Sequence, residues 1–269
     1  MNDSQKGDAL SDLDLIVEAA RQAGTVALGF FRQSPEVWWK NEGRSPVSAA
    51  DFAANETLAS ILRPARPDYG WLSEETDDDA ERLSHETVFV VDPIDGTRGF
   101  LSGLDLWCVS VAVVTNGRPT AGVLYAPALN ELFVATTDGP ALKNGEPIAV
   151  SDRMGQDVHR LATAEDALNG LSADFRKTIE RVKHVPSLAY RLAMVADGRL
   201  EGTIVKRNSH DWDLAAADLI LERAGGALVD LSGQPLTYNR ADVSHGELCG
   251  APAAHLPELL HQLAHRRDG

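Results

Sequence analysis

Apolar and polar positions along the chain repeat with two periods, one typical of helices and one typical of strands. Between Leu13 and Phe31 the apolar residues fall at helical spacing, and Ser11 followed by Asp14 has the pattern of a helix N-cap. We therefore predict a helix that starts close to Ser11. Four further segments are predicted to be helical: residues 48–62, 172–182, 188–197 and 211–224.

Short apolar runs bounded by turn residues predict the strands. The run Val88-Phe89-Val90-Val91 contains no polar residue, which is typical of a buried strand. Further strands are predicted at residues 69–73, 106–114, 120–126, 132–136, 161–164, 202–205 and 227–231. Asn116-Gly117 is a hairpin signal, so the strands that follow residue 106 should be adjacent and antiparallel.

The order of these elements predicts the fold class. Antiparallel strands dominate the chain up to residue 150, whereas strands and helices alternate in the rest. We therefore predict an α+β protein with an N-terminal α+β lobe over residues 1–150 and a C-terminal α/β lobe over residues 151–269. A chain of 269 residues with 43% hydrophobic content is long enough to bury a large core in such a fold.

The formal net charge of −15 makes a nucleic-acid polymer or an anionic membrane a poor main partner, because the field of the protein repels polyanions. A small phosphorylated substrate is still compatible, since divalent cations among carboxylates would invert the field locally. The polar N-terminus lacks the apolar core of a signal peptide, and no run of about 18 apolar residues occurs, so we expect a cytoplasmic protein. Cys108 and Cys249 lack CxxC or zinc spacing and should be buried thiols.

The segment Asp92-Pro93-Ile94-Asp95-Gly96-Thr97 directly follows the buried run 88–91. Its proline and glycine predict a tight loop at the end of the strand. Two carboxylates three residues apart on such a loop can converge on one hard cation. The free N–H groups of Gly96 and Thr97, at the start of a short predicted helix, could hold phosphate oxygens. We interpret the segment as a metal site that handles phosphate.

An EF-hand loop is the obvious alternative for closely spaced acidic residues, and the spacing excludes it. Such a loop needs oxygen ligands at alternate positions and a glutamate at the last position of the loop. Counted from Asp92, the third position is Ile94 and the twelfth is Gly103, and neither side chain has an oxygen.

Two acidic residues elsewhere have positions that suit the same site. Glu74 directly follows a predicted strand, and Asp213 lies at the start of a predicted helix. A carboxylate at a helix start is more often a cap than a ligand, and Asp51, three residues after Ser48, likewise fits a capping box. The candidate ligands are all hard oxygens, which select Mg²⁺ or Mn²⁺ over zinc or copper. They are Glu74, Asp92, Asp95, Asp213 and the backbone carbonyl of Ile94.

Three motifs in this order resemble the inositol monophosphatase family of Mg²⁺-dependent, lithium-sensitive phosphatases. They are Leu72-Ser73-Glu74-Glu75-Thr76, Asp92-Pro93-Ile94-Asp95-Gly96-Thr97 and Trp212-Asp213-Leu214-Ala215-Ala216. The middle motif is highly specific, and the resemblance extends from about residue 13 to about residue 260. It implies a layered α-β-α-β-α sandwich, a homodimer, and hydrolysis of a phosphate monoester with two or three bound Mg²⁺ ions, for which Mn²⁺ could substitute.

The resemblance also implies which residues bind the ions. Glu74, Asp92 and the Ile94 carbonyl would hold the first ion. Asp92, Asp95 and Asp213 would hold the second, so that Asp92 bridges the two ions. A third, weaker ion would bind near Glu74 through water, and Asp95 and Asp213 would also contact the substrate.

Further residues would act in the reaction itself. The nucleophile of the family is a metal-bound water, which Glu74 and Thr97 would orient, and Thr97 would pair with Asp51. Lys40 matches a family lysine just ahead of the second helix, which implies a supporting electrostatic role. Gly96 and Thr97 would bind the substrate phosphate.

Segments outside these motifs are similar to the bacterial 3'(2'),5'-bisphosphate nucleotidases of the family. The segment Gly122-Val123-Leu124-Tyr125-Ala126-Pro127 has alanine where inositol phosphatases more often have aspartate. Arg191 stands where those nucleotidases tend to have a lysine that could meet a second phosphate. Lys206 and Arg207 replace a region where inositol phosphatases place an acidic residue. We therefore favour 3'-phosphoadenosine 5'-phosphate as the substrate.

Two other substrates and one other class of function stay open. Arg98, Gly103 and Trp107 resemble the family's histidinol-phosphate phosphatases, and inositol 1-phosphate is the remaining candidate. A metal-dependent regulatory or binding protein without turnover is the alternative from another class. It is disfavoured because the predicted metal ligands, Thr97 and Asp51 are all present.

Overall fold

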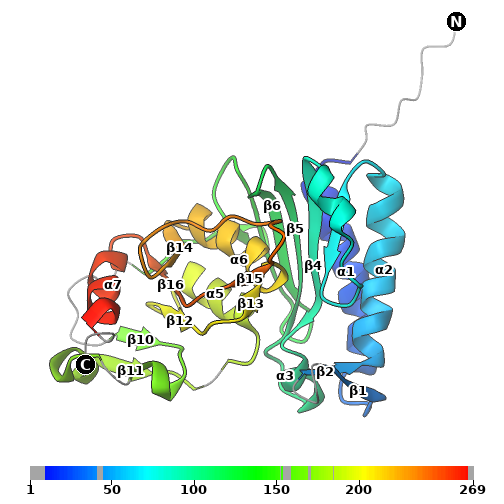
Figure 1. Ribbon diagram of the computed structural model, residues 1–269. Coiled ribbons are helices and arrows are strands. Elements are labelled where there is room, and N and C mark those ends of the chain that lie inside the picture. The colour runs from blue at the N-terminus through cyan, green and yellow to red at the C-terminus, as the bar shows by residue number, and fades with distance from the viewer. Residues whose placement is uncertain are drawn as a thin grey trace, which may run out of the picture.

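The computed structural model describes residues 10–40, 45–151, 153, 159–168, 171–183 and 185–265. Its helices and strands are stacked in the order helix, sheet, helix, sheet, helix (Figure 1). This arrangement confirms the predicted α+β class and the layered sandwich. None of the helices described is both long and apolar enough to cross a membrane. The division into lobes at residue 150 stays a prediction.

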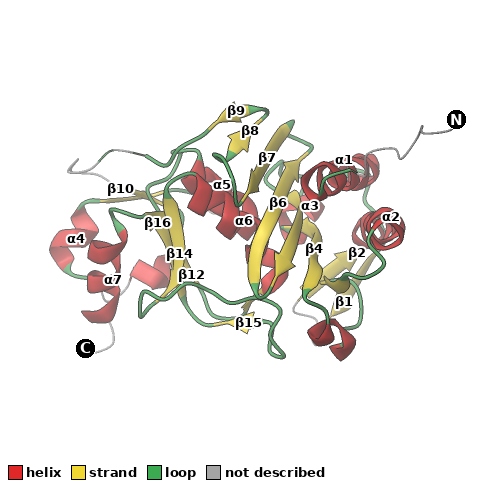
Figure 2. Cartoon of the chain, turned by 90° about the horizontal axis from the view of Figure 1, so that it is seen from above, coloured by secondary structure: helices red, strands yellow, loops and turns green. Residues whose placement is uncertain are grey.

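Two helices form the first layer, against one face of a large sheet (Figure 2). Helix α1 (Asp12–Phe30) begins as predicted, since the Oγ of Ser11 accepts a hydrogen bond from the N–H of Asp14 at 3.1 Å. Helix α2 (Ala49–Ala65) runs slightly further than predicted. Pro64 lies in its last turn, where it removes one hydrogen bond to the preceding turn.

The large sheet has the strand order β3-β4-β5-β6-β7-β8-β9. Its strands are β3 (Gly70–Ser73), β4 (Thr87–Asp95), β5 (Cys108–Thr115), β6 (Arg118–Ala126), β7 (Glu131–Thr136), β8 (Leu142–Lys143) and β9 (Glu146–Pro147). Neighbouring strands are antiparallel, as predicted, except β3 and β4, which are parallel. The parallel pair brings the carboxyl ends of β3 and β4 to the same edge, where Glu74 follows β3.

Helices α5 (Leu188–Ala196) and α6 (Asp211–Arg223) cover the other face of the large sheet (Figure 2). A smaller antiparallel sheet with the order β12-β16-β14 packs behind them. Its strands are β12 (Thr203–Val205), β14 (Gly226–Asp230) and β16 (Leu248–Pro252). Helix α7 (Leu256–His265) forms the last layer. The chain leaves α6 through Gly225 with φ +92°, which agrees with the predicted glycine terminator.

Short elements complete the part of the chain that the structure describes. They are β1 (Val37–Lys40), β2 (Ser45–Ser48), α3 (Thr97–Leu101), β10 (His159–Leu161), α4 (Ala173–Lys177), β11 (Ile179–Arg181), β13 (Ser209–His210), β15 (Ser244–His245) and the 3-10 helices Ala80–Ser84 and Glu165–Leu168. The helix predicted over 172–182 is therefore wrong after Lys177. There the chain pairs with β10 as a parallel strand, and tertiary hydrogen bonding overrides the weak local helix preference.

Buried side chains line both faces of the large sheet. One cluster lies between the sheet and helices α1 and α2, and another lies between the sheet and helices α5 and α6. Cys108 and Cys249 are buried and unbridged, which confirms the prediction of two buried thiols.

Asp218 is a buried carboxyl group within this core, and it should make stability depend on pH. The hydroxyl of Tyr238 donates to it at 2.8 Å, and burial raises its pKa from 3.8 to about 6. The folded protein therefore holds this proton more tightly than the unfolded chain does. We expect the contribution of Asp218 to the free energy of unfolding to fall by about 3 kcal/mol as the pH rises from 4 to 6 and to stay lower above that.

Urea denaturation across this pH range measures the effect, and Asp218→Asn, which imitates the protonated group, should reduce the pH dependence of the free energy of unfolding by about this amount. Asp174→Asn, at a side chain that is 94% exposed, is the control and should leave the dependence intact. Equal pH profiles for the wild type and Asp218→Asn would contradict the assignment.

Candidate active site

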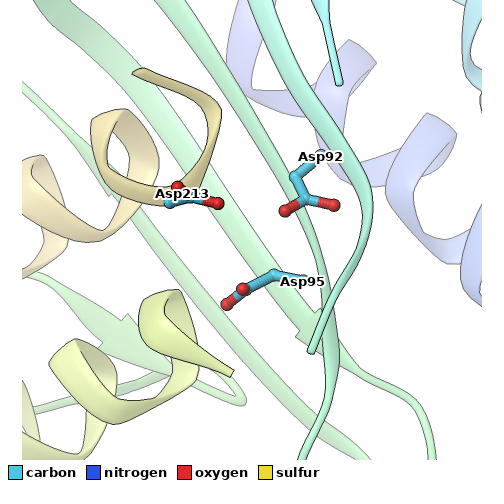
Figure 3. A group of neighbouring side chains, drawn as sticks. All are labelled: Asp92, Asp95 and Asp213. Atoms are coloured by element: carbon cyan, nitrogen blue, oxygen red, sulfur yellow. The ribbon is translucent and has the colours of Figure 1, made fainter. Parts of the chain in front are cut away.

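Strand β4 carries two of the predicted ligands. The prediction that this strand ends at Val91 is wrong. It continues to Asp95, with Asp92 opposite Ser110 and Asp95 opposite Cys108 on β5. Three steps along β4 thus match two along β5, which is a β-bulge. In a regular strand, residues three apart point to opposite faces. The extra residue of the bulge lets both carboxylates point the same way (Figure 3).

Asp213 reaches the same place from the first turn of helix α6. Its Oδ2 accepts a hydrogen bond from the N–H of His210 at 2.6 Å, which forms part of a capping box. Oxygen atoms of Asp92, Asp95 and Asp213 all lie within 4.8 Å of one another (Figure 3). We call these three residues the aspartate cluster. Asp213 is therefore both a helix cap and a member of the cluster.

The start of helix α5 holds Asp95 in place. The Oγ of Ser187 donates to its Oδ2 at 2.5 Å, the N–H of Ala189 donates to the same oxygen at 2.6 Å, and the N–H of Leu188 donates to Oδ1 at 3.2 Å. Burial and the charge of Asp213 raise the pKa of Asp95 to about 7, although these hydrogen bonds lower it. Ser187 was not predicted as a site residue, although a serine just ahead of the predicted helix 188–197 is an N-cap signal.

The aspartate cluster is electrostatically unfavourable by itself. Asp92 and Asp95 are only 1% and 5% exposed. Burial raises the pKa of Asp92 well above its ordinary value, and the charges of Glu74 and of the other two aspartates raise it further. A hard divalent cation would remove this repulsion, and a donor set of oxygens fits Mg²⁺ or Mn²⁺ better than zinc or copper.

Glu74 and the Ile94 carbonyl lie beside the cluster. The N–H of Glu74 donates to the carbonyl of Val91 at 3.2 Å, which ties the residue to β4 next to Asp92. Its charge is the largest electrostatic influence on the pKa of Asp92 after burial. The carbonyl of Ile94 lies 3.1 Å from Thr97 Oγ1, whose single proton can go either to this carbonyl or to Asp51. The role of both groups as metal ligands stays a prediction.

Thr97 and Asp51 form the pair that the resemblance implied. Thr97 Oγ1 donates to Asp51 Oδ1 at 3.1 Å. The other oxygen of Asp51 accepts from the N–H and the Oγ of Ser48, at 2.8 and 2.6 Å, which is the predicted capping box of α2. Burial raises the pKa of Asp51 in spite of these hydrogen bonds. The two interpretations of Asp51, as a cap and as a partner of Thr97, are therefore compatible.

Gly96 links the cluster to this pair. It adopts φ +96°, and a Cβ atom there would lie 3.0 Å from the Cβ of Ser187. A side chain at this position would thus be strained and would press on the residue that holds Asp95. Its predicted contact with the substrate phosphate stays a prediction.

Comparison with known proteins decides the family. Residues 10–267 match the sequence model of the inositol monophosphatase family. The chain belongs to the inositol monophosphatase family. Members of this family are metal-dependent phosphatases, and the aspartate cluster supplies a site that could bind a metal ion. The predicted family and the predicted enzyme class are thus confirmed.

Several relatives share the family and most of the chain. An inositol monophosphatase of Dictyostelium discoideum is 31% identical over 252 residues, which cover 89% of this chain and 90% of that protein. A histidinol-phosphatase of Chlorobaculum parvum is 32% identical over 230 residues, covering 83% of this chain and 87% of that protein. Among solved structures, the Thermotoga maritima IMPase is similar with a TM-score of 0.84 and 26% identity, covering 96% of this chain and 99% of that one.

Arg191 is a predicted substrate contact whose charge interacts with that of Asp95. It is on helix α5, one turn beyond the residues that hold Asp95, and its Nε is buried without a hydrogen-bond partner among the residues described. Burial lowers the pKa of Arg191, and the charge of Asp95 opposes this effect. The structure therefore places a partly desolvated cation near the aspartate cluster.

The other predicted basic contacts are placed differently. Lys206 Nζ pairs with Asp166 at 2.7 Å, and both side chains are exposed. Lys206, Arg207, Asp166 and Glu247 line a depression of about 340 Å³, and the residues that line it do not include the aspartate cluster. Lys40 ends strand β1, and its side chain lies outside the described part of the structure. The roles of Lys40, Lys206 and Arg207 stay predictions.

Proposed function

We propose that the protein hydrolyses a small phosphate monoester with Mg²⁺ bound at the aspartate cluster, Glu74 and the Ile94 carbonyl. The observation that carries the proposal is the convergence of carboxylates from β4 and α6 within 4.8 Å. Bound there, the cation would neutralise charge on the phosphate and on its leaving oxygen. Cytoplasmic location, inhibition by lithium and a homodimer stay predictions from the resemblance and the sequence.

The residues of the chain would direct a water molecule at the phosphorus. Because Thr97 donates its hydroxyl proton to Asp51, its oxygen lone pairs are left to accept a hydrogen bond from that water. Glu74, which follows β3 at the same edge, would accept the other hydrogen. The water oxygen then forms the new P–O bond while one of its protons passes to the carboxylate of Glu74. The ester P–O bond breaks, and the departing alkoxide takes up a proton from a solvent water.

Arg191 supports a substrate with two phosphates. Arg191 is only partly buried, but its Nε is buried and unpartnered among the residues described, which is costly unless an anion meets it. One phosphate of 3'-phosphoadenosine 5'-phosphate at the cluster and the other at Arg191 would provide that anion. We therefore propose this nucleotide as the substrate.

Histidinol phosphate is the second candidate, because a similar protein is named histidinol-phosphatase. Trp107, one of the residues that suggested histidinol phosphate, is explained by its packing. Trp107 is fully buried, and its ring centroid lies 4.9 Å from that of Phe100 and 5.6 Å from that of Phe31. Its presence therefore indicates core packing. Inositol 1-phosphate is the third candidate, since other relatives carry that name.

Comparison of kcat/KM for these three substrates tests the proposal. We expect phosphate release that needs Mg²⁺ and stops with EDTA, with the bisphosphorylated nucleotide as the best substrate. Arg191→Met keeps the bulk of the side chain but removes its charge. It should lower kcat/KM at least about tenfold for the nucleotide and less than about twofold for inositol 1-phosphate, because charged hydrogen bonds contribute this much.

Lys177→Met, at an exposed position of α4, is the matched control and should change none of the three values. A better rate with inositol 1-phosphate or histidinol phosphate would refute the substrate assignment. Metal binding without any phosphate release would favour the regulatory alternative.

A further inference from the structure

Asn55 lies on helix α2 one turn beyond Asp51, next to the turn Ser73–Thr76 that carries Glu74. It belongs to none of the three family motifs. We propose that Asn55 is a positioning residue that fixes the Glu74 turn for metal binding. This inference rests on the proposed role of Glu74 as a metal ligand.

One side of the turn is tied to the large sheet. Ser73 is the last residue of β3, the N–H of Glu74 donates to the carbonyl of Val91 at 3.2 Å, and the N–H of Thr76 returns to the carbonyl of Ser73 at 3.4 Å. These bonds fix where the turn starts. They act on backbone atoms next to Glu74, and they leave the tilt of the turn relative to β4 to other contacts.

Asn55 fixes the other side by bridging both ends of the turn. Its Oδ1 accepts a hydrogen bond from the Oγ of Ser73 at 2.7 Å, and its Nδ2 donates to the Oγ1 of Thr76 at 3.2 Å. The same two hydroxyl groups continue the network, because Ser73 Oγ accepts from the N–H of Glu75 at 3.3 Å and Thr76 Oγ1 accepts from Trp71 Nε1 at 3.3 Å. Glu74 is thus held between two residues that Asn55 connects.

Helix α2 thereby positions two parts of the site at once. Asp51 and Asn55 are four residues apart, so they lie on the same face of the helix. Asp51 accepts a hydrogen bond from Thr97, and Asn55 holds the turn that carries Glu74. Thr97 and Glu74 are the two residues that would orient the attacking water. The helix is itself anchored, since Ala54 and Leu58 are fully buried against the core. A carboxylate ligand whose supporting hydrogen bonds are lost typically binds its metal 10- to 100-fold more weakly.

The test measures the affinity for Mg²⁺ directly, by isothermal titration calorimetry of the whole protein, together with the Mg²⁺ concentration for half-maximal activity. Asn55→Ala should raise the dissociation constant about tenfold. Asn55→Asp can still accept from Ser73 and from a rotated Thr76 hydroxyl, and should restore affinity to within about threefold. Thr57→Ala, two residues along the same helix, removes only a bond to the carbonyl of Ala53 within α2, and should change the constant less than about twofold.

Thr76→Val breaks one half of the bridge at an exposed position and keeps the test valid if Asn55→Ala fails to fold. The double variant should bind Mg²⁺ no more weakly than Asn55→Ala alone, because both act through the same contact. An unchanged affinity in Asn55→Ala, or an equal loss in Thr57→Ala, overturns the inference while the proposed function stands. A wild-type protein that binds no divalent cation overturns the proposed function itself.

Discussion

Replacing Asp92 with asparagine is expected to lower kcat/KM for the phosphate monoester about a thousandfold, because the central charge of the metal site is lost while its shape is kept. Asp92 is buried and stands among the other two aspartates and Glu74. It accepts a hydrogen bond from the N–H of Ile94 at 3.0 Å, which an asparagine oxygen can also accept. Steady-state kinetics at saturating Mg²⁺ measures the loss.

The same variant should fold at least as well as the wild type when no metal is present. It removes a buried charge that its neighbours repel, so the melting temperature in EDTA should be unchanged or higher. The rise in melting temperature on adding Mg²⁺ should disappear, since that rise comes from binding to the folded state. Asp174→Asn, at a side chain that is 94% exposed, is the control for both measurements. Activity within tenfold of the wild type would refute the assigned site.

Asp92 is a sharper choice for this experiment than Asp95. The oxygens of Asp95 accept from Ser187, Leu188 and Ala189, and an asparagine there would turn its own N–H groups toward some of these donors. A loss of activity in Asp95→Asn could then come from a disturbed start of helix α5. The structure therefore separates two ligands that the sequence presents as equivalent.

Thr97→Val is expected to lower kcat about a hundredfold, because it removes the hydroxyl group that would accept a hydrogen from the attacking water. The shape of the side chain is kept, so KM and the affinity for Mg²⁺ should change less than about threefold. Pre-steady-state or steady-state kinetics over a range of pH measures the effect on the chemical step.

Thr97→Ser is the control, because it keeps the hydroxyl group and the hydrogen bond to Asp51. It should retain activity within about fivefold of the wild type. Equal losses in Thr97→Val and Thr97→Ser would show that the methyl group matters through packing, and would remove Thr97 from the reaction. Because Asp51 also caps α2, its own substitution would be harder to interpret.

The aspartates could be predicted because each lies at an element boundary that local sequence signals mark. Asp92 follows an unbroken apolar run, and Asp213 starts a helix whose apolar face and terminal glycines are plain in the sequence. Such signals depend on residues a few positions apart. The family resemblance then supplied their order, and the structure confirms that they converge.

The bulge in β4 could not be predicted in the same way. Pro93 and Gly96 are typical of a loop, and only the pairing with β5 shows that the strand continues to Asp95. Ser187 and Asn55, whose hydrogen bonds hold the site residues in place, were not predicted because their partners are far away in the sequence. Ser187 lies 92 positions from Asp95, and Asn55 lies 18 positions from Ser73, so no local pattern connects either pair. Contacts of this kind arise from the packing of whole layers.

The hydrogen bonds that α5 donates to Asp95 bear on how this family can lose its activity. A carboxylate that accepts the hydrogen bonds at the start of a helix contributes to folding whether or not an ion binds it. A related protein that has given up catalysis could therefore keep Asp95 for its helix while Asp92, which has no such second task, drifts. For sorting enzymes from inactive relatives, the residue aligned with Asp92 is thus the more informative of the two.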